Sequence, residues 1–329
     1  MTAEAITGFI AEASLAPSVH NVQPARWRAE ADGATLFEDR SRRLPAADPR
    51  GHDAAISLGA AAEGLRLAAS RASYGVETVL LNEAMNNGLR PIARLRLTSG
   101  GKADPLAAFV PTRASHRGAF ARASEADRVA ASALASDDAT ALTAPSLLVE
   151  AGRQLDAASW TFMRDDAFRR ELLSWMRLSP RDPNWLRDGL NADAMAMGKI
   201  AATGAGLVLG QFFSSLASVG LAKPLLAEGG RIAKDTAIVL FHRPEGEPPF
   251  ESGAHFYRLW LRIEAAGFGA AVLAALADNA KANAWAREAG RVPAGRRLIN
   301  AFRIGRRPSE QAAPRARLPI AELLVSTTA

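Results

Sequence analysis

A short polar turn near the N-terminus carries the side chains best suited to hold a ligand. Residues 16–24 place hydrogen-bonding side chains beside two prolines, directly after an apolar, helix-like stretch at 6–15. Because proline fixes φ and stops a helix, we expect a rigid turn that could hold a planar polar ligand. An ordinary helix exit with local capping explains the same residues equally well. The candidate binding residues here are Pro17, Ser18, His20, Asn21 and Gln23.

A second group of polar residues could bind phosphate. Arg113, Ser115, His116 and Arg117 occur within one five-residue stretch, and we expect a helix to follow it at 125–136. Arginine forks bind phosphate well, and the free N–H groups at a helix start also favour an anion. A basic turn on the surface is the alternative interpretation of this segment.

Two further segments lie near the C-terminus. A tight glycine exit follows the helix that carries Trp260, and it would let the backbone approach a flat ring, although a plain helix C-cap has the same residues. Two arginines at i and i+2 of an extended segment point the same way, as a phosphate clamp requires, although a basic tail is the alternative. The candidates are Gly267, Phe268 and Gly269, then Arg315 and Arg317.

These four segments resemble motifs of the nitroreductase family of FMN-dependent oxidoreductases. The first turn resembles the family's P-S-x-x-N-x-Q-P-W segment, and residues 113–117 resemble its R-x-S-x-R element. Residues 267–269 resemble the segment whose backbone N–H faces flavin N5, and residues 315–319 resemble its C-terminal K-x-R-L-P. One departure is Ala25, which stands where the family has tryptophan.

The order of the motifs differs from that of ordinary family members, in which R-x-S-x-R comes first. Ordinary members are homodimers whose flavin sites join two subunits, so the resemblance implies a fused dimer with one complete FMN site per chain. In this respect the chain is similar to the tandem branch of the family, which includes flavin-sequestering proteins. We predict an N-terminal half at 1–108 and a C-terminal half at 109–329, with a helical lid insertion at about 178–222.

The fold class that the resemblance implies is α+β, a three-layer α-β-α sandwich with two related halves that form a pseudo-dimer. A weak internal repeat favours the same duplication. Coincidence among Ala/Leu/Gly-rich helices is the alternative. The residues Gly59, Ala60, Leu65 and Leu67 are matched by Gly253, Ala254, Leu259 and Leu261 at a constant offset of 194.

Local patterns predict the elements of both halves. Alternating apolar residues predict a strand at 92–97, and Asp32-Gly33 predicts a hairpin. We predict helices at 2–15, 52–73, 125–136, 152–177, 191–222 and 252–266, and strands at 27–30, 35–37, 76–81, 92–97, 146–150, 237–242 and 298–303.

Composition limits the possible functions. The 329 residues are 48% hydrophobic and 22% charged, which is typical of a globular chain long enough for two domains. The lack of cysteine excludes disulfides and thiolate chemistry, and the scattered histidines predict no metal site. A net charge of +6 without aromatic-interleaved basic motifs favours a small anionic partner over nucleic acid.

One long segment of the chain lacks charged residues. Residues 200–222 contain no charge and are long enough to span a bilayer, but glycines and serines interrupt them. We therefore predict a buried helix, a lid or a subunit contact and expect no stable membrane insertion. The N-terminus shows no secretory signal, so a cytoplasmic location is expected.

The resemblance implies an enzyme that transfers hydride from NAD(P)H through FMN to a nitroaromatic, a quinone or another conjugated small molecule. Few family members need a proteinic acid–base group, so no catalytic residue is named. The chain is expected as a monomeric pseudo-dimer or a homodimer. The alternative is a flavin-sequestering protein whose closed lid prevents turnover.

Overall fold

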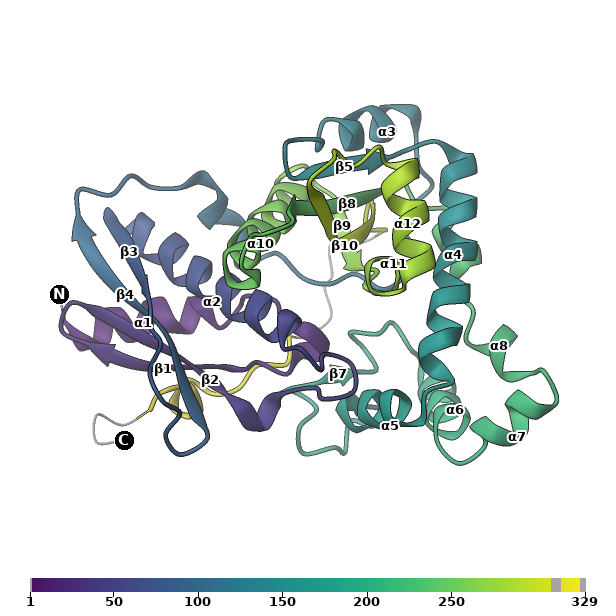
Figure 1. Ribbon diagram of the computed structural model, residues 1–329, viewed down its shortest axis with the longest axis horizontal. Helices are drawn as coiled ribbons and strands as arrows, with labels where there is room; N and C mark the ends of the chain where they lie inside the picture. Colours follow the sequence, from purple (N-terminus) through teal and green to yellow (C-terminus); the bar gives the residue numbers. More distant parts are fainter. Residues whose placement is uncertain (1, 309–314, 326–329) are drawn as a thin grey trace.

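The structure is a computed structural model that describes residues 2–308 and 315–325. The chain contains both helices and strands, and a lobe of short helices projects from one end (Figure 1). The strands are β1 (Ala25–Glu30), β2 (Gly33–Asp39), β3 (Tyr74–Leu80), β4 (Leu89–Ser99), β5 (Ala139–Leu142), β6 (Met176–Arg177), β7 (Leu190–Asn191), β8 (Ala237–Pro244), β9 (Gly269–Val272) and β10 (Arg296–Gly305). The α-helices are α1 (Ala3–Ala13), α2 (His52–Arg71), α3 (Glu125–Ser132), α4 (Pro145–Met163), α5 (Asp166–Trp175), α6 (Lys199–Leu209), α7 (Phe213–Ser218), α8 (Ala222–Leu225), α9 (Gly229–Ile232), α10 (Pro249–Ala265), α11 (Ala275–Asp278), α12 (Ala280–Ala289) and α13 (Ile320–Leu323).

Two four-stranded sheets share one topology. The first has the order β1-β2-β4-β3 and the second the order β5-β8-β10-β9, and every pairing within them is antiparallel. In each sheet a long helix, α2 or α10, connects the second strand of the chain order to the third. The predicted α+β class and the prediction of two related halves are therefore confirmed.

The two long helices cross at a pair of glycines. A Cβ on Gly59 would overlap the carbonyl oxygen of Phe250, and a Cβ on Gly253 would overlap that of Ile56. The offset of 194 relates Gly59 to Gly253 and Ile56 to Phe250, so each half makes the same contact with the other. Reciprocal contacts of this kind occur about a two-fold axis, which makes α2 and α10 the centre of the pseudo-dimer.

The second half has the complete three layers of the predicted sandwich. The α10 side chains of Phe256 and Trp260 pack against Phe302 of β10 on one face of the sheet. The helices α4, α11 and α12 cover the other face and bury an apolar cluster that includes Leu155 and Leu240. Both faces of this sheet are consequently apolar, and β8 is buried along almost its whole length.

The first half is covered by helices on one face of its sheet. Alternation along β4 turns Ala93 and Leu95 toward α1 and α2, where both are fully buried. The other face carries ion pairs, among them Arg94 to Glu30 at 2.9 Å and Arg28 to Glu30 at 3.2 Å. Charged residues on that face explain why no helix layer is needed there.

The C-terminal segment 315–325 crosses back to the first half. Leu318 and Leu323 lie in the core of that half, and the Val325 N–H donates to the Trp27 carbonyl at 2.8 Å. The C-terminal tail, which follows the second sheet in the chain, thus contributes to the core of the first half. The domain boundary expected between residues 108 and 109 stays a prediction.

A long insertion interrupts the second sheet. Between β5 and β8 the chain forms α4 to α9, where the first half has only the turn at 31–32. The prediction of a strand at 146–150 is wrong, because Pro145 begins a helix whose Leu148 and Ala151 face the core. The predicted helix at 191–222 is divided into α6, α7 and α8 by irregular backbone that includes Gly210.

Candidate functional site

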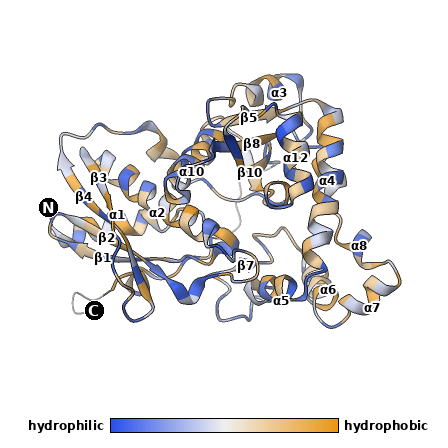
Figure 2. Cartoon of the chain, viewed as in Figure 1, coloured by the Kyte–Doolittle hydropathy of each residue, from blue (hydrophilic) through white to orange (hydrophobic). Residues whose placement is uncertain are grey.

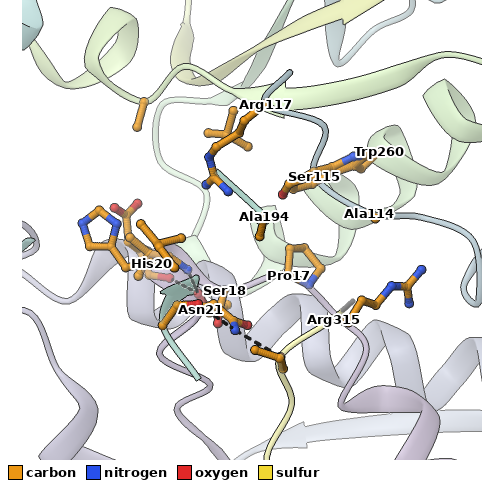
Figure 3. A pocket seen from close by; sticks show the side chains of 18 of the residues that line it. Pro17, Ser18, His20, Asn21, Ala114, Ser115, Arg117, Ala194, Trp260 and Arg315 are labelled. Carbon is orange, nitrogen blue, oxygen red and sulfur yellow. Dashed lines mark hydrogen bonds between the residues drawn. The ribbon is translucent and has the colours of Figure 1, made fainter. Parts of the chain in front are cut away.

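A cavity of about 250 Å³ lies where the two halves meet, at one end of the α2–α10 crossing (Figure 3). Three of the predicted segments line it, namely 17–21, 113–117 and 315–317. Because they are far apart in sequence, only the fold brings them together. The other lining residues are Asp53, Ile56, Ser57, Gly189, Leu190, Asn191, Ala194, Phe256, Trp260, Val272, Ala274 and Asn300.

The polar turn has an unusual backbone. His20, Asn21 and Gln23 have φ values of 45°, 55° and 51°, in the left-handed region that residues other than glycine seldom adopt. Such conformations cost on the order of 1 kcal/mol each and persist only where the surrounding structure holds them. Here the Ser18 hydroxyl accepts from the Gln23 N–H at 3.0 Å and the Ser57 hydroxyl from the Val19 N–H at 3.3 Å.

The Asn21 amide joins three segments of the chain. Its Nδ2 donates to the Gly189 carbonyl and to the Ala316 carbonyl, both at 3.1 Å, and its Oδ1 accepts from Arg317 at 2.9 Å. The side chain is therefore saturated by protein groups. Its role in this structure is to fix the turn between the loop at 186–191 and the C-terminal tail.

Gln23 and His116, both predicted to bind the cofactor, do not line the cavity. The Gln23 amide donates to the Arg187 carbonyl at 2.8 Å and accepts from the Leu318 N–H at 2.9 Å, so it positions the turn from behind. The His116 ring makes a hydrogen bond of 3.0 Å with the Ala119 carbonyl and stacks on a phenylalanine of its own loop.

Arg317 is also occupied by the protein. Its guanidinium donates to the carbonyls of Ser14 at 2.7 Å, Ala316 at 2.8 Å and Leu15 at 3.1 Å, besides the Asn21 amide. These carbonyls include the C-terminal end of α1, where the helix dipole favours a cation. Arg317 therefore caps a helix at the cavity wall, and its N–H groups are already engaged.

The remaining three arginines differ in how free they are. The Arg117 side chain reaches the middle of the cavity (Figure 3) and has no hydrogen-bond partner among the described residues. Arg113 is buried over the Trp260 ring at 4.6 Å and donates to the Leu15 carbonyl at 2.6 Å, while its Nε has no partner within the described part of the chain. Arg315 donates to a carbonyl of the loop before Arg113.

These arginines repel one another in a dry environment. Burial, followed by the charges of Arg113 and Arg315, lowers the pKa of Arg317 to about 9. Burial and the charge of Arg113 lower the pKa of Arg315 to about 10. Burial, with a smaller contribution from Arg117, lowers the pKa of His20 to about 4, so this imidazole is neutral at pH 7. Four arginines and one carboxylate, that of Asp53, line the cavity, so its excess of cationic side chains suits an anion.

One acidic residue of the cavity was missed by the sequence reasoning. Burial, and then the carboxylates of Asp278 and Asp48, raise the pKa of Asp53 to about 7. Local sequence motifs give no signal for it, because Asp53 has the pattern of an ordinary acidic residue in the first turn of a helix, here α2. Phe256 and Trp260 were likewise expected only as helix residues, although their spacing on α10 places both on one face.

The glycine exit at 267–269 does not line the cavity. The Gly267 N–H donates to the Glu264 carbonyl at 2.8 Å and the Phe268 N–H to the Ile263 carbonyl at 3.1 Å, as at the end of a helix. The chain reaches the cavity a few residues later, at Val272 and Ala274. These two N–H groups are thus unavailable to a ligand in this structure.

The segment 113–117 is extended beside β9, where Ser115 forms a bridge to Ala270. The following helix, α3, begins at Glu125, as predicted, but its first turn does not line the cavity. Any anion at this position depends on the side chains of Arg113, Ser115 and Arg117.

A loop from the insertion covers the cavity. Gly189 and Leu190 line it directly, and the Arg317 N–H donates to the Leu186 carbonyl at 3.0 Å. An ion pair of 2.6 Å between Arg187 and Glu322 holds the same loop. A further ion pair joins Arg42 to Asp188 at 3.1 Å.

The cavity can bind a flat molecule with an anionic group. Buried polar atoms normally have partners, but the Nε of Arg113 and the indole N–H of Trp260 have none among the described residues. The aromatic side chains of α10 offer an apolar wall, and Arg117 offers a free guanidinium. An FMN molecule, which joins a planar ring to a phosphate, fits this donor set.

Comparison with known proteins gives limited matches, and no protein-family model matches the chain. A putative NAD(P)H nitroreductase of Mycobacterium tuberculosis is 39% identical over 72 residues, 22% of each chain. An uncharacterised protein of the same organism is 46% identical over 63 residues, 18% of each chain. The matches span about a fifth of each relative. The predicted resemblance to nitroreductases is confirmed by the first relative over the matched segment.

Two solved structures are similar to this chain. A putative nitroreductase from Anabaena variabilis has a TM-score of 0.45 at 10% identity and covers 89% of this chain and 82% of its own. A nitroreductase with bound FMN from Bacteroides fragilis has a TM-score of 0.35 at 10% identity and covers 64% of this chain and 92% of its own.

Proposed function

We propose that this protein is an FMN-dependent oxidoreductase that takes hydride from NAD(P)H and passes it to a nitroaromatic, a quinone or another conjugated small molecule. The observation that carries the proposal is the cavity between the halves, which is lined by a free Arg117 guanidinium and by Arg113, whose guanidinium lies over the Trp260 ring and whose Nε has no partner among the described residues. The sequence match to a putative NAD(P)H nitroreductase supports the same reaction class.

The residues of the cavity would hold the cofactor by charge and shape. Arg117 and Arg113 would bind the phosphate, while Ser18 and Ser115 offer hydroxyl groups at the cavity wall. Arg315 and Arg317 would act through their positive potential, since their N–H groups already donate hydrogen bonds to backbone carbonyls. FMN, when bound, supplies the hydride chemistry of the site.

The positive potential has a chemical consequence. Flavin gains negative charge as it is reduced, and cations fixed in a dry cavity favour the more negative form. His20 is neutral at pH 7, so it can donate or accept a hydrogen bond at the cavity wall without adding charge. The loop at 186–191 would limit access of water to the ring.

A specific observation favours a second candidate function, flavin sequestration with little turnover. The loop at 186–191 is tied down by Asn21, Gln23 and Arg317 and by the Arg187–Glu322 ion pair. A loop held from both halves would keep a nicotinamide from stacking on the flavin unless it opens.

An absorption experiment distinguishes these functions. The purified protein is examined for the visible absorption of flavin, reconstituted with FMN, and then mixed with NADH or NADPH without oxygen. Bound flavin that bleaches supports the oxidoreductase, and bound flavin that stays coloured supports sequestration. Failure to retain FMN after reconstitution would reject both functions.

A further inference from the structure

The insertion lobe carries an apolar surface that the flavin site does not use. We define the lobe tip as residues 199–226, the part of the chain that contains α6, α7 and α8. Six of the twelve exposed large apolar side chains among the described residues belong to it. They are Ile200, Leu207, Phe212, Val219, Leu221 and Leu225, and Ile200 is 90% exposed.

The lobe tip is a folded projection. It lies at the far end of the molecule from the first sheet (Figure 1), and apolar colour runs along its helices (Figure 2). Arg169 anchors it from beneath, because its guanidinium lies 3.8 Å from the Phe213 ring centroid and donates to the Leu209 carbonyl at 3.1 Å. The exposed apolar side chains thus stand on a fixed base, and soluble monomers seldom expose such a concentration.

The charges on this segment have one sign. Between Asp193 and Glu228 the charged residues are Lys199 and Lys223, both of which are exposed. Exposed apolar side chains with flanking lysines and no carboxylate complement a surface of anionic headgroups over an apolar layer. In the described part of the chain, no helix combines the length and apolarity needed to cross a bilayer.

We propose that the lobe tip docks on membranes that contain anionic lipids. Phe212, Leu221 and Leu225 would enter the boundary between headgroups and acyl chains, and Lys199 and Lys223 would contact the headgroups. Asn191 and Ala194, which line the cavity, precede the tip in the same insertion, so docking would hold the covered side of the cavity near the lipid.

Vesicle flotation with the full-length chain tests the proposal. We expect binding to vesicles of phosphatidylglycerol and phosphatidylcholine, and weaker binding to pure phosphatidylcholine or at high salt. The double variant Phe212→Ser/Leu221→Ser should lose at least about tenfold in vesicle affinity. The matched control is Val129→Ser, which changes an apolar side chain that is 64% exposed on α3, outside the tip.

Three results would overturn the proposal. They are wild-type protein that does not float with anionic vesicles, equal loss of binding in the Val129→Ser control, and a lipid-free dimer that Phe212→Ser/Leu221→Ser abolishes. The last result would assign the tip to contact with a second copy of the chain. Circular dichroism of each variant shows whether it is folded, and Lys199→Glu/Lys223→Glu provides a second test that leaves the apolar side chains in place.

Discussion

Two cavities lie at the two ends of the α2–α10 crossing, and they differ in the side chains that line them. The first is the candidate flavin cavity, and the second, of about 280 Å³, is lined by the opposite ends of the same helices. The offset of 194 relates the linings of the two cavities. It pairs Ile56 with Phe250, Ser57 with Glu251, Ala62 with Phe256 and Arg66 with Trp260.

The segments that join the helices distinguish the two cavities further. The first receives the turn at 17–21, the segment at 113–117 and the tail at 315–317, whereas the second receives Thr78 and Leu80 from β3. The cation of the second cavity, Arg66, is already paired with Glu63 and donates to the Thr78 hydroxyl at 3.0 Å. A duplicated scaffold thus offers two hollows, of which one has a free guanidinium, and we expect one flavin per chain.

The largest expected effect concerns the crossing that relates the two halves. Gly59→Val and Gly253→Val each place side-chain atoms against a backbone carbonyl of the other helix, so each should lower the free energy of unfolding by about 3 kcal/mol. Urea denaturation measures it. The control Gly8→Ala lies in α1 with open space around it and should raise stability by about 0.5–1 kcal/mol. A large effect at one crossing glycine alone would contradict the pseudo-two-fold relation.

The next largest effect is on FMN affinity, and it compares one arginine from each cavity. Arg117→Ala should weaken FMN binding by about 30- to 100-fold, or about 2–3 kcal/mol, because it removes the free guanidinium. Arg66→Ala, the matched change in the second cavity, should leave FMN affinity unchanged. Flavin fluorescence titration measures both, and equal losses would show that the cavities are not distinct.

A smaller effect concerns the covering loop, which only the first cavity has. Asn21→Gly removes the amide that holds Gly189 and Ala316, and glycine tolerates the φ of 55°. Losing these hydrogen bonds should destabilise the covered state by about 1–2 kcal/mol and speed flavin release about tenfold. Stopped-flow fluorescence measures the rate. The control Asn87→Gly, at a φ of 49° in an exposed loop, should release flavin at the wild-type rate.

The smallest effect is a difference in pH dependence between equivalent acids. The pKa of Asp53 is raised to about 7, chiefly by burial, whereas that of Glu247, its counterpart by the offset of 194, is lowered chiefly by hydrogen bonds from Arg243. A raised pKa means that the folded state gains stability from the bound proton at low pH and loses it as pH rises through about 7. The lowered pKa of Glu247 has the opposite consequence, because its contribution to stability is lost as pH falls through that pKa.

Thermal denaturation between pH 6 and 8 tests this contrast. Asp53→Asn should be more stable than the wild type at pH 8 by about 1 kcal/mol and should lack part of the wild-type decline. Glu247→Gln should lose stability at neutral pH, because the wild-type carboxylate is stabilised there and loses that stabilisation only as pH falls through its depressed pKa. Parallel pH profiles for the two variants would contradict the assignment.

Much of the fold could be predicted from local sequence. The predicted hairpin at Asp32-Gly33, the helix at 52–73 and the strand at 92–97 correspond to β1–β2, α2 and β4. These elements have strong periodicity or a defined turn, both of which are local properties. The strand expected at 146–150 failed because a short apolar run fits a helix equally well, and Pro145 together with packing on the second sheet decided for α4.

The candidate site could be predicted as a set of segments, but not as a set of contacts. The turn and the two arginine segments line one cavity, as the resemblance implied, yet Asn21 and Arg317 are bonded to each other and to backbone groups. Hydrogen-bond partners of this kind lie almost 300 residues apart along the chain, so no local pattern reveals them.

The sequence by itself determined which segments carry chemistry and where two helices can cross, because side-chain type and the absence of a Cβ are properties of single residues. Only the tertiary structure decided which arginine stays free. That choice depends on which carbonyls reach each guanidinium once both halves and the tail have closed around the cavity, and here they occupy Arg317 and leave Arg117 available.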